Sequence, residues 1–255
     1  MLKVDLNSDL GESFGNYTLG LDGEVLEYVS SANIACGWHA GDPLVMDKTI
    51  ALAKEHGVAI GAHTGFPDLL GFGRRNMAIT PYEAYTYTKY QLGAFYGFAK
   101  AHGLSIQHIK PHGAFYNMCA VDIALSREVC RAVHEFDPQI ILLGLAGSQM
   151  IQAAQEAGMR AASEFFADRA YMDDGTLAPR RMDGSVIHDQ SIALARIVKM
   201  IKTGMVTTIT GKDIPLKCQS ICVHGDNKNA VAFVNLIRQK LTEEGIAVAP
   251  LEEIV

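Results

Sequence analysis

The sequence predicts an α/β protein with about seven parallel strands. Short apolar runs that resemble buried strands alternate with helix-like segments along the 255 residues. The joints are marked by Gly57, Gly103, Gly158 and Gly245, each of which follows a helical segment and precedes an apolar run. Glycine at this position tolerates the left-handed conformation that ends a helix. Right-handed crossovers would wind such strands into a barrel or an open doubly wound sheet, and periodicity alone favours neither.

The expected elements follow one another in a regular order. Apolar runs predict strands near residues 3–7, 31–36, 58–62, 106–110, 140–145, 161–166 and 220–224. The intervals predict helices near residues 43–56, 81–102, 122–136, 148–157, 189–202 and 227–243. Thr80, Pro81 and Glu83 form a capping box with a first-turn proline, and Asp42 precedes Pro43 in the same way.

Two longer segments, residues 65–75 and 169–189, interrupt this alternation. Their composition is that of functional loops, because long ordered loops in a domain are usually lids or binding loops. Neither segment resembles a linker. We therefore expect residues 1–255 to form one domain.

The composition indicates a soluble protein of the cytoplasm. The chain has no apolar run close to the ~20 residues of a membrane helix and no apolar signal region at its start. A net charge of -6 argues against a nucleic-acid partner. The five cysteines are odd in number and lack C-x-x-C spacing, which favours reduced thiols. Cys36 lies nearest to a candidate site, although a buried structural thiol is the commoner role.

Polar side chains gather where the predicted strands end. Histidine follows four of the apolar runs, in the segments NIACGWHAGD, VAIGAHTG, IQHIKPHGA and SICVHGD. The first strand ends near Asp9 and Glu12, and the sixth contains Glu164 and is followed by Arg169. Loops at the carboxyl ends of parallel strands converge on one face of a sheet or barrel. We therefore expect one shared site.

The mixture of carboxylates, imidazoles and cations suits the hydrolysis of an amide or ester in a small acidic substrate. Glu164 would point into a barrel and must then be paired, with Lys110 and Arg169 as natural partners. A cation can bind the substrate's anionic groups, while a carboxylate or imidazole activates water. A divalent metal held by Asp9, His63 and His112 is an alternative use of the same groups.

Nucleotide-binding motifs are absent. The segment GMVTTITGKD has six residues between its glycines, where a phosphate-binding loop has four, and ends in aspartate instead of serine or threonine. No G-x-G-x-x-G opens the first helix. The sequence leaves open whether ATP touches this chain.

Six blocks of sequence resemble the LamB/YcsF family. They are VDLNSDLGESFG, SANIACGWHAGDP, GAHTGFPDLLGFGRR, IKPHGAFYN, SEFFADRAYMDDGTLAPR and ICVHGD, and they span residues 4–226. The resemblance implies an irregular seven-stranded parallel β/α barrel of the glycoside hydrolase/deacetylase type. It also implies the activity of the A component of an ATP-dependent 5-oxoprolinase, which converts 5-oxo-L-proline to L-glutamate together with subunits B and C.

The resemblance also implies which residues form the site. Asp9, His63, Lys110, His112 and Glu164 are expected to be catalytic, and Glu12, His39, Arg169, His224 and Asp226 are expected to bind substrate. Two rival functions remain: a metal-dependent deacetylase of a small or sugar substrate, and a non-catalytic metabolite-binding subunit. The sequence leaves homo-oligomerisation open.

Overall fold

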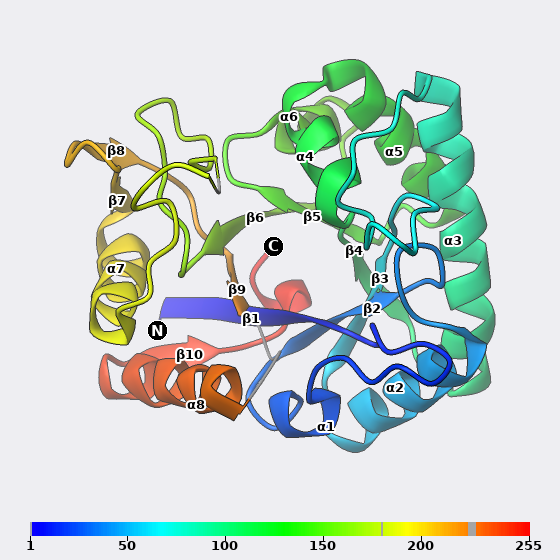
Figure 1. Ribbon diagram of the computed structural model, residues 1–255, viewed down its shortest axis with the longest axis horizontal. Coiled ribbons are helices and arrows are strands. Elements are labelled where there is room, and N and C mark those ends of the chain that lie inside the picture. Colours follow the sequence, from blue (N-terminus) through cyan, green and yellow to red (C-terminus); the bar gives the residue numbers. More distant parts are fainter. Residues whose placement is uncertain (1, 180, 224–227) are drawn as a thin grey trace.

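Seven parallel strands close into a barrel in the computed structural model, which describes residues 2–179, 181–223 and 228–255 (Figure 1). Around the barrel the order is β1, β2, β3, β4, β5, β6 and β9, and β9 pairs with β1 to close it. The strands are β1 (Leu2–Leu10), β2 (Ser31–Ala35), β3 (Ala59–His63), β4 (Ile106–Ile109), β5 (Ile141–Leu145), β6 (Ala161–Phe166) and β9 (Ser220–Val223). The fold that the resemblance implied is therefore confirmed.

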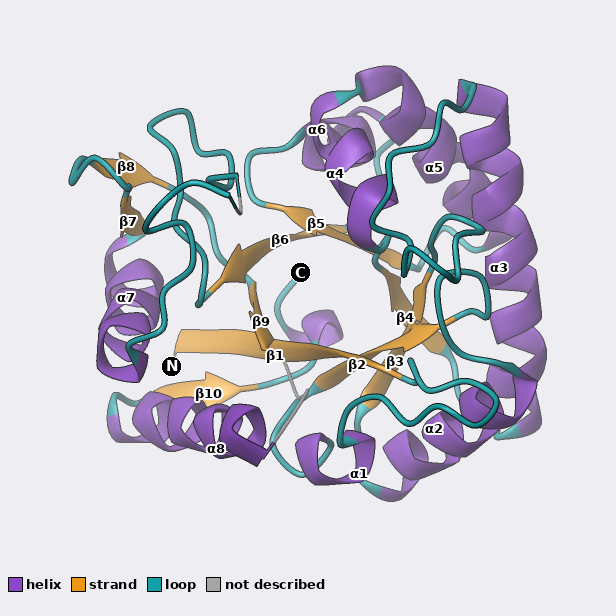
Figure 2. Cartoon of the chain, viewed as in Figure 1, coloured by secondary structure: helices purple, strands orange, loops and turns teal. Residues whose placement is uncertain are grey.

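Helices cover the outside of the barrel (Figure 2). They are α1 (Asp22–Val25), α2 (Pro43–Glu55), α3 (Pro81–Ala101), α4 (Gly113–Val121), α5 (Ile123–Phe136), α6 (Gln149–Glu156), α7 (Gln190–Thr203) and α8 (Lys228–Glu243). The capping box at Thr80 forms as predicted, and the Asp42 carboxylate accepts hydrogen bonds from the N–H groups of Leu44 and Val45. No helix in the described part of the chain has the length and apolar character that crossing a membrane requires.

Several elements were not predicted. Helix α4 follows β4 at once, and its apolar side chains are buried on several sides, so it lacks the one-sided pattern of a surface helix. The helix α1 and the strands β7 (Met205–Thr207), β8 (Asp213–Pro215) and β10 (Ile246–Val248) have three or four residues each, too few to show a period. Strands β7 and β8 form an antiparallel pair, while β10 extends the sheet beside β1.

Strand β1 sorts its side chains into two environments. Val4, Leu6 and Leu10 belong to the hydrophobic core between the barrel and its helices. Asp5, Asn7 and Asp9 alternate with them and make hydrogen bonds or ion pairs with side chains of other barrel strands or of the residues that follow them. The barrel interior near the site is therefore polar.

The other end of the barrel is filled by apolar side chains. Leu251 of the short helix η1 (Leu251–Glu253) is fully buried against Ile141, Leu143 and Ala162. The Arg160 guanidinium donates to the carbonyl of Val255, which holds the C-terminal segment in place. The prediction of one domain over residues 1–255 stays a prediction.

Candidate active site

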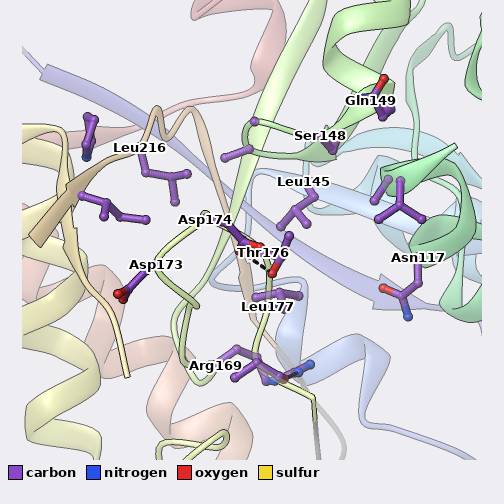
Figure 3. A pocket seen from close by; sticks show the side chains of 18 of the residues that line it. Asn117, Leu145, Ser148, Gln149, Arg169, Asp173, Asp174, Thr176, Leu177 and Leu216 are labelled. Atoms are coloured by element: carbon purple, nitrogen blue, oxygen red, sulfur yellow. Dashed lines mark hydrogen bonds between the residues drawn. The ribbon is translucent and has the colours of Figure 1, made fainter. Parts of the chain in front are cut away.

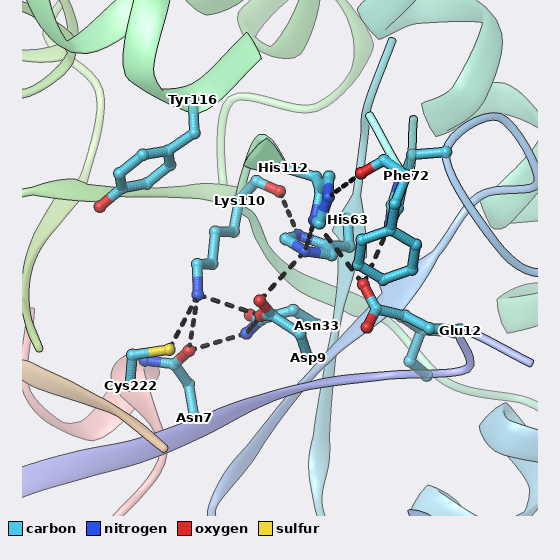
Figure 4. Close-up of polar contacts among 12 residues, drawn as sticks. Asn7, Asp9, Glu12, Asn33, His63, Phe72, Lys110, His112, Tyr116 and Cys222 are labelled. Atoms are coloured by element: carbon cyan, nitrogen blue, oxygen red, sulfur yellow. Dashed lines mark hydrogen bonds and ion pairs between the residues drawn. The ribbon is translucent and has the colours of Figure 1, made fainter. Parts of the chain in front are cut away.

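The structure brings eight of the predicted site residues to the carboxyl ends of the barrel strands (Figure 4). Asp9 lies on β1, His63 ends β3, and Glu164 lies on β6, while the others lie in the loops that follow strands. These are Glu12, His39, Lys110, His112 and Arg169. His224 and Asp226 lie outside the described residues. The expected convergence on one face of a barrel is thus observed for the described positions.

Lys110 lies at the centre of the group and is 3% exposed. Its Nζ is 3.0 Å from Asp9 Oδ1 and 2.7 Å from Glu164 Oε1, and it donates to Asn7 Oδ1 at 3.2 Å (Figure 4). Burial would lower the pKa of Lys110, but the nearby Asp9, Cys222 and Glu164 raise it well above its usual value. Lys110 is therefore a permanent cation here and not a base.

Glu164 points into the barrel, as predicted, and is fully buried. Its Oε2 accepts a hydrogen bond of 2.6 Å from the Tyr116 hydroxyl, while Oε1 pairs with Lys110. Glu164 does not line the cavity next to Lys110, whereas Tyr116 does. Its place in the structure is to balance and orient Lys110.

Asp9 carries the negative charge that faces the cavity. Burial would raise the pKa of Asp9, but the neighbouring His63 and Lys110 lower it well below its usual value. Asn33 Nδ2 donates to Asp9 Oδ1 at 2.8 Å. Asp9 is therefore ionised, and one of its oxygens is held by both Asn33 and Lys110.

The orientation of Asn33 is itself set by His108. Burial, with help from Lys110 and His63, lowers the pKa of His108 to about 3, so its imidazole is neutral. Gln107 Nε2 donates to His108 Nδ1 at 3.1 Å, which leaves His108 Nε2–H to donate to Asn33 Oδ1 at 2.7 Å. The sequence interpretation of His108 as a structural residue agrees with this buried position.

Two histidines face each other with their unprotonated nitrogens. His63 Nδ1–H donates to the Lys110 carbonyl and His112 Nε2–H donates to the Phe72 carbonyl, both at 2.8 Å, because a carbonyl can only accept. His63 Nε2 and His112 Nδ1 therefore direct lone pairs at each other across 2.9 Å. Asp9 Oδ2 lies 3.3 Å from the first and Glu12 Oε1 3.6 Å from the second. A proton or a cation must occupy this point.

His39, which the motif pattern alone supported least, belongs to the same group. Its ring stacks on that of His112, with centroids 3.7 Å apart and 4° between the planes. His39 Nε2 is 3.2 Å from Glu12 Oε1, whereas its Nδ1 is buried without a hydrogen-bond partner. Burial lowers the pKa of both His39 and His112, the latter to about 2, so both rings are neutral.

The residues best placed to hold a metal differ from the predicted set in part. Potential ligand atoms of Glu12, His39, His63 and His112 all lie within 4.8 Å of one another. The sequence predicted His63 and His112 correctly as members of such a set but paired them with Asp9. Asp9 is drawn instead toward Lys110 and Asn33.

Cavities open on both sides of this group. One of about 230 Å³ is lined by Asp9, His63, Lys110 and Tyr116 among others. A second, of about 480 Å³, reaches Asp9 and Glu12 from the other side. Arg74, from the loop of residues 65–75, lines both, and sequence reasoning missed it because nothing distinguished it from the adjacent arginine.

The largest cavity, of about 940 Å³, adjoins the first (Figure 3). The two share Asn117, Arg169 and Leu177. Arg169 is only 8% exposed and donates a hydrogen bond of 2.6 Å to the Ala178 carbonyl, so it also supports the loop after β6. The geometry thus places Arg169 at the edge of the site and not at its centre.

The buried thiols take no part in this chemistry. All five cysteines are free, and burial raises the pKa of Cys36 to about 12. A thiol with such a pKa is not a nucleophile near neutral pH.

The chain is similar to proteins of one family over almost its whole length. The model of the LamB/YcsF family matches residues 4–255. A protein of Alkaliphilus metalliredigens described as the A component of 5-oxoprolinase is 57% identical over 255 residues, which is 100% of both chains.

Solved structures agree with this similarity. A crystal structure described as a lactam utilization protein from Thermus thermophilus superposes with a TM-score of 0.93 at 44% identity, covering 97% of this chain and 99% of that one. A family 4 carbohydrate esterase from Streptomyces lividans, in complex with acetate, gives a TM-score of 0.52 at 11% identity and covers 97% of each chain. The second likeness concerns the fold alone.

Proposed function

The chain belongs to the LamB/YcsF family, and on that premise we propose that it is the A component of a 5-oxoprolinase, a hydrolase that opens the cyclic amide of 5-oxoproline to form glutamate. The observation that carries the proposal is the pairing of a buried cation, Lys110, with an ionised carboxylate, Asp9, at one small cavity. A lactam opens when water adds to its carbonyl carbon. That reaction needs a proton acceptor for the water and a positive charge for the oxygen.

The residues divide this work according to their positions. Asp9 accepts the proton of the attacking water and later returns it to the ring nitrogen, while His63 shares the proton with it at 3.3 Å. Lys110 stabilises the negative charge that develops on the oxygen of the lactam carbon. Glu164 acts through Lys110, and His112 acts through His63, since neither presents a free oxygen or nitrogen of its own to the cavity.

Coupling to ATP overcomes the poor reactivity of the amide. We propose that partner subunits B and C transfer the terminal phosphoryl group of ATP to the lactam oxygen. Water then adds to the carbon, the ring nitrogen takes a proton and leaves, and a second water releases phosphate from the acyl phosphate to give glutamate. The complex works in the cytoplasm, in keeping with the five free cysteines.

Purified chain, mixed with subunits B and C, ATP and 5-oxo-L-proline, is expected to release glutamate and ADP. Omitting this chain should abolish glutamate formation, because the partners then have no pocket in which water can open the ring. The measurement is glutamate by chromatography, with acetylated sugars as the control substrate. Release of acetate without glutamate would instead establish a deacetylase, and binding of 5-oxoproline without turnover would establish a binding subunit.

The histidine cluster also fits a divalent metal ion. The donor set of Glu12, His63 and His112 contains one carboxylate oxygen and two imidazole nitrogens, which is a common set for zinc. The backbone bonds of His63 and His112 already fix the tautomers that a metal requires. His39 completes the set through Nε2 or orients Glu12. A bound divalent ion would supply Lewis acidity and lower the pKa of a water molecule.

Cobalt(II) is expected to bind the wild-type chain at about one ion per chain, with the visible absorption bands of a low-coordinate site. His63→Gln and His112→Gln should each weaken the binding about 100-fold, because each removes a nitrogen ligand. His102→Gln is the matched control, since His102 is a partly exposed histidine that pairs with Asp47 away from the cluster. Equal uptake by all four proteins, or none by the wild type, would exclude the metal and leave a proton between the two histidines.

A further inference from the structure

We propose that Arg74 forms the subsite that recognises the carboxylate of the substrate. The proposal deepens the proposed function and rests on it, because it concerns an acidic lactam bound at the same cavity. It assigns to a residue outside the predicted set the choice between 5-oxoproline and lactams that lack the carboxylate.

Arg74 lies where the mouths of two cavities meet. It lines both the cavity of about 230 Å³ and the one of about 480 Å³, and both are also lined by Asp9 and His112. Its guanidinium carbon is 5.0 Å from the centre of the Phe72 ring, and its side chain is exposed. The cation therefore stands at the entrance and is open to an incoming ligand.

The loop that carries Arg74 is held closely against the site. Asp68 closes the loop by pairing with Arg75, and the Gly73 carbonyl accepts a hydrogen bond of 2.9 Å from Ala114 N–H. A Cβ at Gly73 would stand only 2.7 Å from the His39 Cβ, so the backbone packs directly on the histidine cluster. The position of Arg74 relative to the catalytic groups is thus fixed by packing.

The other cations near the cavity are already engaged. Lys110 pairs with Asp9 and Glu164, and Arg169 donates to the Ala178 carbonyl. Within residues 2–179, 181–223 and 228–255, no ion pair is formed by Arg74. Without Arg74 the mouth of the cavity would present the carboxylates of Asp9 and Glu12 to an anionic substrate.

The chemistry of guanidinium matches a carboxylate. Its planar fork donates two parallel hydrogen bonds to the two oxygens, which a lysine cannot do. 5-Oxoproline has one carboxylate and one lactam group. We infer that Arg74 holds the carboxylate while Lys110 and Asp9 act on the lactam.

The test uses the chain assembled with its partner subunits. Arg74→Gln is expected to raise KM for 5-oxo-L-proline about 10- to 100-fold, the loss of a charged hydrogen-bonded pair, while kcat changes less than about threefold. The neutral carboxamide of 5-oxoproline serves as a competitive inhibitor, and its Ki should be the same for the variant and the wild type. Arg127→Gln is the control, because Arg127 is an exposed arginine of α5 that pairs with Glu156.

Each other outcome overturns the assignment. An unchanged KM, a loss confined to kcat, or an equal rise in the Ki of the carboxamide would show that Arg74 does not read the carboxylate. Failure of the proposed function is seen separately, because the wild-type complex would then release no glutamate. A melting temperature for Arg74→Gln equal to that of the wild type confirms that the variant is folded.

Discussion

Lys110→Met is expected to lower turnover by about 10²–10³-fold, as the loss of one charge-stabilising donor does in other hydrolases. It should also lower the free energy of unfolding by about 3–5 kcal/mol, because Asp9 and Glu164 would keep buried charges without their cation. Methionine preserves the length of the side chain, so packing changes little. Glutamate formation by the complex and urea denaturation of the chain measure the two effects.

The double variant Lys110→Met/Glu164→Gln separates charge balance from catalysis. The amide that replaces the Glu164 carboxylate would keep an oxygen for the Tyr116 hydroxyl and remove one of the two stranded charges. We expect the double variant to regain part of the lost stability but none of the lost activity. Wild-type turnover in the single variant would remove Lys110 from the mechanism.

Gly61→Ala is expected to disturb the site from inside the barrel. A Cβ at residue 61 would stand 2.2 Å from His108 Nε2, so the ring must move. We expect overpacking to lower the free energy of unfolding by about 1–3 kcal/mol. Moving His108 also releases Asn33, which holds Asp9, and a misplaced carboxylate should lower kcat about tenfold to a hundredfold.

Gly93→Ala is the matched control for this substitution. Gly93 lies inside α3, and no atom comes within 4 Å of a Cβ built there. The change should stabilise the chain by about 0.5–1 kcal/mol, as alanine does in a helix. If Gly61→Ala behaves like Gly93→Ala in both stability and kcat, then His108 does not position Asp9.

The sequence predicted the barrel strands well because each is an apolar run with a clear end. In β1, however, Asp5 and Asn7 lie within the strand and face the polar interior, which the alternation of one strand cannot distinguish from a solvent-facing surface. Helix α4 was missed for the opposite reason, since its apolar side chains are buried on several sides. The closed barrel itself followed from the family resemblance and not from periodicity.

The site shows the same division. His63, His112 and Lys110 could be found because glycine or proline turns after strands advertise them. Arg74 could not, because Arg74 and Arg75 are identical neighbours, and only the closing of the loop by Asp68 decides which one is left for the cavity. Asn33 and Tyr116 act through partners distant in sequence, which a local pattern cannot reveal.

The pairing of the first barrel strand with the last has a consequence for biosynthesis. Asp5 and Ser220 are hydrogen-bonded although they are 215 positions apart. Contacts between such distant segments make folding slow, since a long chain must be brought together before they form. A nascent chain still on the ribosome would carry Asp9, His63 and Lys110 but could not close the ring that supports them, so catalysis should begin only after translation has passed β9.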